Sequence, residues 1–191
     1  WKARTGSKAV GYFCTYVPEE LVYAAGLLPI RVLGSHEPQD LAEPHILSMF
    51  CPFCRDCLAE GLRGRYEYLE GIVHAQSCLH IRQAFESWKM HLPVEYSHYL
   101  FMPSNLESPS ARICLEEELE AFKRSLEEWT GKPIRQRALA EAIDAYNTNR
   151  RLLRQLYELR KASPPPISGA ETMQVVLASM FMDKKEHSVL L

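Results

Sequence analysis

The sequence predicts an α/β fold in which a four-stranded parallel sheet with flanking helices is followed by a helical segment. Two patterns support this fold class: short β-rich runs alternate with helical patterns in the first half, and long charged helical patterns fill the second. The composition is that of an ordinary globular protein, since 47% of the 191 residues are hydrophobic and 24% are charged. This length suits one domain, or one domain and part of a second.

Four short runs rich in apolar, β-branched and aromatic residues are the expected strands. They cover residues 9–16, 28–33, 71–75 and 96–102. Helical patterns separate them, and strands that alternate with helices pair in parallel through right-handed crossovers. Ligands of such sheets bind at the carboxyl ends of the strands. The loops that follow the first and third strands, residues 14–20 and 75–78, are therefore the first places to look for a site.

Three helices are expected between these strands. The first follows Pro18, which together with two acidic residues suits a first helical turn, and it closes at Gly26. The second covers about residues 52–62, where a proline again fits the first helical position. The third is an amphipathic helix over about residues 79–91.

The character of the chain changes near residue 108, so residues 1–108 are expected to form the α/β domain and residues 109–191 a helical segment. Helices are expected over residues 110–129 and 135–161, and a third begins near Ser168, where an acidic residue three positions on completes a capping box. The chain starts with Trp rather than Met and lacks a helix-ending signal at its last residues. The helical segment is therefore expected to lead to a further domain that this chain does not contain.

Charge and hydropathy exclude two classes of partner. The 22 Lys and Arg against 24 Asp and Glu leave a net charge of -2 without a long block of one sign, so no nucleic acid partner is expected. No apolar run approaches the roughly 20 residues that cross a bilayer, and the N-terminus lacks the apolar core of a signal peptide. No membrane association is expected, and the predicted localisation is cytoplasmic.

Three of the six cysteines recur at every third position: Cys51, Cys54 and Cys57. On a helix this spacing spreads the thiols over about a third of the circumference, so all three could face one object. The same run begins the bacterial ferredoxin motif, but here the fourth cysteine and the following proline are missing, so a ferredoxin fold is not expected. Spacing favours metal binding over simple burial for this cluster together with Cys78, but it does not decide which thiols are ligands.

Other interpretations of the remaining candidates stay open. Cys14 and Cys114 are isolated and are most simply small buried residues. A structural zinc site would need a coincidence of folding, because no second C-x2-C pair is present. His74 and His80 are more simply core or capping residues than bases. The sequence contains no dinucleotide-binding, P-loop, nucleophile-elbow or H-E-x-x-H motif.

Several motifs, in order along the chain, resemble the 2-hydroxyacyl-CoA dehydratase and benzoyl-CoA reductase family. Residues 11–29 resemble its opening strand, its V-P-x-E turn and its A-A-G-x-x-P motif. Phe50-Cys51 before a helix, residues 64–73 and Ser77-Cys78 then repeat the order and spacing of that family. Residues 145–152 are similar to its helical segment. The resemblance is specific, because it extends over nearly the whole chain and rests on several motifs.

The resemblance implies a subunit with two Rossmann-like domains that hold a [4Fe-4S] cluster between them with cysteines of both. By position, Cys51 and Cys78 would bind the cluster. Cys54 is a further candidate metal ligand, because it could substitute for one of them. The catalytic candidate is Glu20 of the V-P-x-E turn, which could relay protons. The remaining family cysteine would come from the absent second α/β domain.

The resemblance also implies a function, that of an iron-sulfur subunit of an ATP-activated acyl-CoA enzyme. An ATP-dependent activator iron-sulfur protein would deliver low-potential electrons, which pass through the cluster to a CoA-thioester substrate. The reaction would be 2-hydroxyacyl-CoA dehydration or benzoyl-CoA ring reduction, performed with a homologous second subunit. Two alternatives remain: a non-catalytic cluster-bearing partner for electron transfer or assembly, and a zinc-stabilised α/β binding module.

Overall fold

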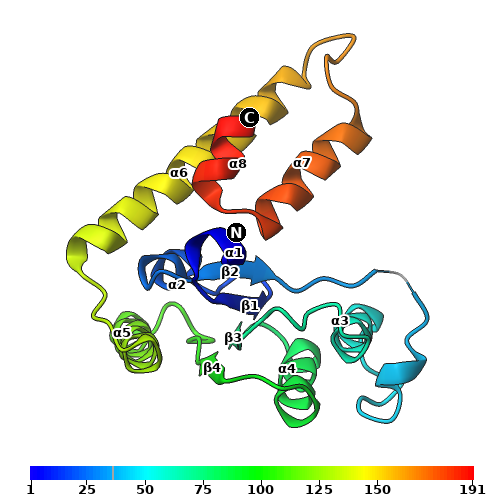
Figure 1. Ribbon diagram of the computed structural model, residues 1–191, viewed down its shortest axis with the longest axis vertical. Coiled ribbons are helices and arrows are strands. Elements are labelled where there is room, and N and C mark those ends of the chain that lie inside the picture. Colours follow the sequence, from blue (N-terminus) through cyan, green and yellow to red (C-terminus); the bar gives the residue numbers. More distant parts are fainter. Residues whose placement is uncertain (36) are drawn as a thin grey trace.

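In the computed structural model, which describes residues 1–35 and 37–191, one parallel sheet forms the centre of the first half of the chain. Its four strands lie in the order β2-β1-β3-β4 (Figure 1). The strands are β1 (Ala9–Phe13), β2 (Leu28–Arg31), β3 (Gly71–Ala75) and β4 (Tyr96–Leu100). All three pairings are parallel, with Phe13 opposite His74 between β1 and β3. The predicted α/β fold class is confirmed.

Three of the expected strands end early. The first was expected to reach residue 16, but β1 stops at Phe13 because Cys14 takes a left-handed conformation with φ of 59°. A side chain with a Cβ rarely adopts this conformation, and it turns the chain out of the sheet. Strand β2 stops at Arg31 and β4 at Leu100, each two residues before its expected end.

Helices cover both faces of the sheet. The elements in chain order are α1 (Lys2–Thr5), α2 (Glu19–Ala24), the 3-10 turn η1 (Asp40–Ala42), α3 (Pro52–Leu62), α4 (Leu79–His91), α5 (Ala111–Thr130), α6 (Gln136–Leu159), α7 (Gly169–Phe181) and α8 (Lys184–Leu190). The helices predicted over residues 52–62 and 79–91 are thus found at those bounds. The longer helices agree within one or two residues of the bounds expected for them.

The core has two layers, one on each face of the sheet. Helices α3 and α4 bury Leu58, Phe85 and Trp88 against one face, and α2 and α5 bury Leu21 and Phe122 against the other. Figure 1 shows α3 and α4 together on one side of the strands and α5 on the other. Burial of such side chains is the main stabilising term, worth about 1.5–3 kcal/mol for each large one. The layers hold α3 and α4 next to each other.

Close contact between α3 and α4 depends on Gly61. A Cβ added there would lie 2.7 Å from the ring of Trp88 and equally close to a methyl group of Leu92. Only a glycine lets the α3 backbone approach α4 this closely. The N-termini of the same two helices follow Cys51 and Cys78, so their packing sets where these two cysteines stand.

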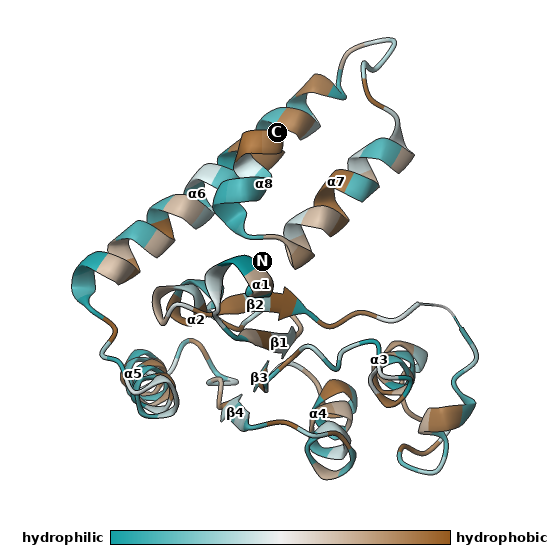
Figure 2. Cartoon of the chain, in the orientation of Figure 1, coloured by the Kyte–Doolittle hydropathy of each residue, from teal (hydrophilic) through white to brown (hydrophobic). Residues whose placement is uncertain are grey.

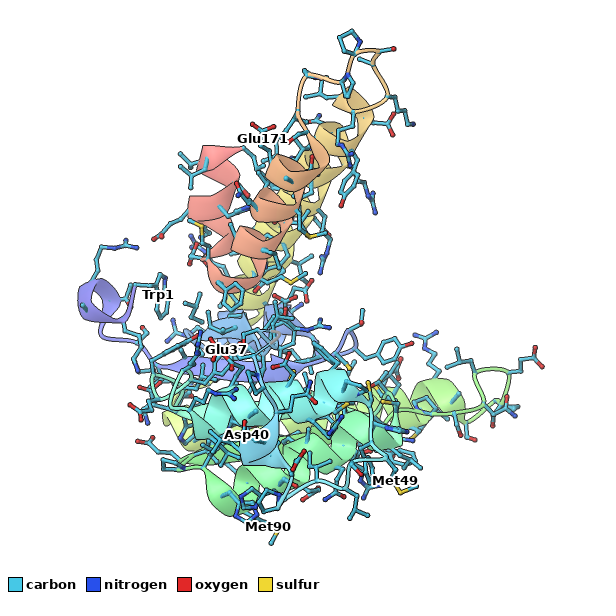
Figure 3. All side chains as sticks on the ribbon, turned by 90° about the vertical axis from the view of Figure 1, so that its right-hand side faces the viewer. Trp1, Glu37, Asp40, Met49, Met90 and Glu171 are labelled. Atoms are coloured by element: carbon cyan, nitrogen blue, oxygen red, sulfur yellow. The ribbon has the colours of Figure 1, made fainter. Side chains whose placement is uncertain are left out.

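Helices α6, α7 and α8 extend away from the sheet (Figures 1 and 3). They join it through α2: the rings of Tyr23 and Tyr146 meet edge to face with centroids 5.8 Å apart, and the Tyr23 hydroxyl donates to the Asp183 carboxylate over 2.9 Å. The capping box predicted at Ser168 is present, since Ser168 and Glu171 exchange side-chain to backbone hydrogen bonds at the start of α7. Glu171 is labelled in Figure 3.

Hydrophobic residues remain exposed on this helical extension. Figure 2 shows brown segments on α7 and at the end of α8. The side chains concerned include Met173, Leu177, Val189 and Leu190. In the described parts of the chain, no helix combines the length and the apolar character needed to span a membrane.

Candidate cysteine site at the carboxyl edge of the sheet

Cysteines from three segments meet at the carboxyl edge of the sheet. Cys14 directly follows β1, and Cys78 follows the neighbouring strand β3 after a short turn. Because these strands run in parallel with Phe13 opposite His74, both cysteines leave the sheet at the same edge. Cys51 comes from a third segment, the loop that precedes α3. All six cysteines of the chain are free thiols.

Cys54 lies at the centre of this group and interacts with its neighbours. Burial raises the pKa of its thiol, and the nearby thiols of Cys51, Cys78 and Cys14 raise that pKa further. The backbone N–H of Cys54 also donates a hydrogen bond to the carbonyl oxygen of Cys51 over 3.0 Å. Four thiols therefore share one electrostatic neighbourhood, which we call the cysteine site: Cys14, Cys51, Cys54 and Cys78.

Cys51 and Cys78 occupy equivalent positions, because each is the residue that caps the N-terminus of a helix. Cys51 caps α3 and is half-buried, and Cys78 caps α4 and is exposed. Neither side chain accepts a capping hydrogen bond, so both thiols are free for other partners. The positive end of a helix dipole stabilises negative charge, and thiolates are the form that binds metals. These are the two predicted cluster ligands, and the structure brings them together.

His80 is a residue of this site whose contact the sequence did not predict. Its Nδ1 accepts a hydrogen bond from the backbone N–H of Cys51 over 2.8 Å, and its ring meets that of Phe50 edge to face. This contact satisfies an amide at the entrance to α3 that would otherwise lack a partner within the helix. The sequence shows that His80 follows Cys78 by two residues, but this spacing does not indicate a contact with Cys51.

Cys57 continues the three-residue spacing, and the thiols of Cys54 and Cys14 act on it too, but we leave it out of the site because its side chain is completely inaccessible. It is fully buried among the core residues of α3, with its sulfur 3.8 Å from the carbonyl oxygen of Val32. Burial raises the pKa of its thiol, which opposes the thiolate form. Cys57 is thus a core residue. Cys114 lies in the first turn of α5, outside the cysteine site.

Glu20, the catalytic candidate, lies in the first turn of α2 and faces the helical extension. Its Oε1 accepts a hydrogen bond from the guanidinium of Arg150 on α6 over 2.5 Å. Arg150 is half-exposed while it forms this ion pair. The contact joins α2 to α6, and it holds the carboxylate of Glu20 against α6.

His74 is a core residue, as expected from the sequence; it lies in β3, just before the turn that leads to α4. Its ring is fully buried and packs edge to face against Phe13 and Tyr99, with Phe85 also in contact. Burial lowers the pKa of His74 to about 4. The imidazole is therefore neutral at physiological pH and is part of the layer beneath the cysteine site.

The cysteine site is not arranged around a single ion. In residues 1–35 and 37–191, no group of three His, Cys, Asp or Glu side chains stands close enough together to hold one metal ion. A structural zinc site needs four ligands around one ion, so the described thiols do not form one by themselves. A [4Fe-4S] cluster instead takes one thiolate on each iron, and it accommodates ligands that are further apart.

Comparison with known proteins finds relatives over nearly the whole chain. Residues 14–191 match the family described as 2-hydroxyglutaryl-CoA dehydratase, D-component. A benzoyl-CoA reductase subunit of Thauera aromatica is 28% identical over 194 residues, which cover 100% of this chain and 50% of that protein. Lactoyl-CoA dehydratase subunit beta of Anaerotignum propionicum is 30% identical, with coverage of 100% and 50%. The chain thus spans about half the length of these relatives.

Proposed function

Because this chain belongs to the 2-hydroxyglutaryl-CoA dehydratase D-component family, we propose that it is part of an iron-sulfur subunit of an ATP-activated acyl-CoA dehydratase or reductase. Relatives of both kinds support this class: one is named as part of a benzoyl-CoA reductase, and another is named (R)-2-hydroxyglutaryl-CoA dehydratase, subunit beta, from Acidaminococcus fermentans. The observation that carries the proposal is the placement of Cys51 and Cys78 at the N-termini of adjacent helices.

The donor set fits a [4Fe-4S] cluster. Its natural ligands are cysteine thiolates, and the site offers Cys51 and Cys78 as accessible thiols at positive helix ends. Cys54 is the less suitable candidate, because it is only 2% exposed. The two thiols leave coordination positions open, and a second α/β domain, within the half of the relatives' length that this chain does not span, would supply further ligands.

When bound, the cluster supplies low-potential electrons for reduction of a CoA thioester. The residues of this chain hold and shield it. His80 and Gly61 fix α3 against α4, and the core beneath, with neutral His74, keeps water from the buried side. Glu20 would hold and release a proton at its carboxylate near the carboxyl end of β1, and Arg150 would fix the position of that carboxylate.

The surface beside the cysteines suits protein partners. Exposed apolar side chains flank the site cysteines in sequence, and Met49 is labelled where it projects from the loop before α3 (Figure 3). They are Tyr16, Met49, Phe53 and Leu79. Exposed apolar groups of this kind mark interaction surfaces. We assign this surface to the homologous second subunit and to the ATP-dependent activator, both in the cytoplasm.

Turnover by the assembled enzyme tests the proposal. The full-length parent protein would be combined without oxygen with its second subunit, the activator, ATP and either a 2-hydroxyacyl-CoA or benzoyl-CoA. We expect product with one of the two substrates, loss of product with Cys51→Ser or Cys78→Ser, and retention with Cys57→Ser as the matched control. Cluster content without turnover of any CoA thioester would instead favour a non-catalytic electron-transfer or assembly partner.

A further inference from the structure

Cys51 and Cys54 form a pair of thiols with unequal exposure. Cys51 is half-buried and precedes α3, whereas Cys54 is 2% exposed in the first turn of that helix. The backbone N–H of Cys54 donates a hydrogen bond to the carbonyl oxygen of Cys51 over 3.0 Å, whereas Cys78 and Cys14 come from other segments of the chain. Of the thiols around Cys54, Cys51 is therefore the one that the local backbone holds beside it.

The backbone at Cys51 does not impose the spacing of a regular helix on this pair. Residues three apart inside a helix have Cβ atoms about 5–6 Å apart, and a disulfide needs roughly 3.5–4.5 Å. Cys51 is outside the helix, with φ of -51° and ψ of 129°, so helical spacing does not hold its Cβ away. Pro52 at the first helical position fixes the turn between the two. Cys54 and Cys57, in contrast, both lie inside α3 and keep the helical spacing.

From this geometry we propose that, when no metal occupies the site, Cys51 and Cys54 form a reversible disulfide by exchange with a low-molecular-weight disulfide. The arrangement is that of a C-x-x-C redox pair, in which the accessible cysteine at a helix N-terminus attacks and the buried one resolves. This second chemistry of the site needs only the thiols of the chain itself. It holds whether or not the proposed enzyme function is correct.

The exchange balances in atoms and electrons. The thiolate of Cys51 attacks one sulfur of an external disulfide, the external S–S bond breaks, and the released thiolate takes up a proton. Cys54 then loses its proton to water, and its thiolate attacks the Cys51 sulfur of the mixed disulfide. The second external thiol leaves. Two protein thiols are oxidised by two electrons, and one external disulfide is reduced to two thiols.

The disulfide protects a thiol that is otherwise exposed to oxidation. A half-buried thiolate without a metal is open to sulfinic and sulfonic acid formation, which cannot be reversed by thiols. A disulfide with Cys54 can be reversed by a thiol reductant, and it keeps Cys51 from binding metal until it is reduced. Metal could then be loaded only under reducing conditions. This requirement would come from the Cys51–Cys54 disulfide itself, in addition to any sensitivity of the metal group to oxygen.

Peptide mapping after oxidation tests this proposal without any variant. The metal-free chain, prepared with a chelator and a reductant without oxygen, would be treated with glutathione disulfide, blocked with an alkylating agent and digested with trypsin. Cleavage after Arg55 leaves Cys51 and Cys54 in one peptide, Cys57 in the next and Cys78 in another. We expect the first peptide to lose two hydrogens and to escape alkylation, and a thiol reductant to reverse this.

Variants sharpen the test. Cys54→Ser should accumulate the glutathione adduct on Cys51 at least tenfold over the native chain, because no resolving thiol remains, and Cys57→Ser should behave as the native chain does. The proposal is overturned by a cross-link to the Cys78 peptide, by a lasting adduct on native Cys51, or by two free thiols. Absence of any iron in the purified protein would contradict the enzyme function and leave this result unaffected.

Discussion

The backbone N–H of Cys51 donates a hydrogen bond to Nδ1 of His80 over 2.8 Å, although the two residues are 29 positions apart. The bond ties the entrance of α3 to the first turn of α4. Cys51 and Cys78 stand at the starts of these two helices, so the same bond fixes the distance between the two proposed cluster ligands. The stability of the cysteine site should therefore depend on a residue that binds no metal.

Replacing His80 with alanine should loosen this site. The Cys51 amide loses its acceptor, which costs about 0.5–1.5 kcal/mol and leaves α3 less firmly placed against α4. We expect faster release of iron to a chelator from the anaerobically purified protein. His80→Asn is the matched variant, because its side-chain oxygen can accept the same bond. Equal release rates for the alanine variant and the native protein would show that His80 does not position Cys51.

Gly61→Ala should destabilise the fold. Its Cβ would meet Trp88 and Leu92 at 2.7 Å, and overpacking of this kind costs about 1–3 kcal/mol, more than the helix propensity that alanine adds. The free energy of unfolding in urea measures the effect. Gly169→Ala is the control, since its Cβ would meet only an Arg160 side-chain nitrogen at an ordinary 3.5 Å. A neutral Gly61→Ala would mean that α3 and α4 are free to separate.

Separate variants of Glu20 and Arg150 distinguish a proton-carrying role of Glu20 from a role in the ion pair alone. If Glu20 carries a proton, Glu20→Gln should lower turnover of the complete enzyme about 100-fold or more, as loss of an acid–base group does. Arg150→Gln removes the same half-exposed ion pair but keeps the carboxylate, so it should lose at most a few-fold in turnover and under about 1 kcal/mol of stability. Full turnover by Glu20→Gln would leave Glu20 with a purely structural role.

Burial of His74 predicts a pH dependence of stability. The pKa of the folded protein's His74 is about 4, below the ordinary 6.5, so the unfolded chain binds the proton more readily between these values. The stabilisation due to neutral His74 is fully present above pH 6.5 and is lost as the pH falls toward 4. Between pH 7 and pH 5 the loss should be about 2 kcal/mol.

Urea unfolding of the native chain and of His74→Phe between pH 7 and pH 5 measures this contribution of His74 to the free energy of unfolding. The slope of stability against pH should be smaller in the variant, whatever its absolute stability. The other histidines whose pKa is lowered by burial, the half-buried His98 and the buried His187, titrate alike in both proteins and cancel in the comparison. Parallel curves for the two proteins would show that His74 is hydrated or protonated in the fold.

Much of the fold could be predicted because local signals agreed with the tertiary structure. The Pro52 and Gly26 signals, the apolar runs and the Ser168 capping box all specify short-range structure, and those elements formed as expected. The end of β1 was misplaced because the left-handed turn at Cys14 is not favoured by a cysteine side chain. No local propensity indicates such a turn.

The site could be predicted only in part. Parallel pairing placed the loops after β1 and β3 at one edge, and the family resemblance selected Cys51 and Cys78. Cys14 was taken for a simple buried residue, although its position after β1 already put it at that edge. The contact of Cys51 with His80 and the pairing of Glu20 with Arg150 join residues far apart in sequence, and only the packing of the helices determines them.

Metal analysis of the full-length parent protein, purified without oxygen, tests the central claim most directly. Iron, acid-labile sulfide and zinc would be measured in the native protein, in Cys51→Ser and Cys78→Ser, and in Cys57→Ser as the control. We predict about four irons and four sulfides for each subunit, lost in the first two variants and kept in the third. Zinc without sulfide, or a full complement of iron in both Cys51→Ser and Cys78→Ser, would contradict the assignment of these cysteines to an iron-sulfur cluster.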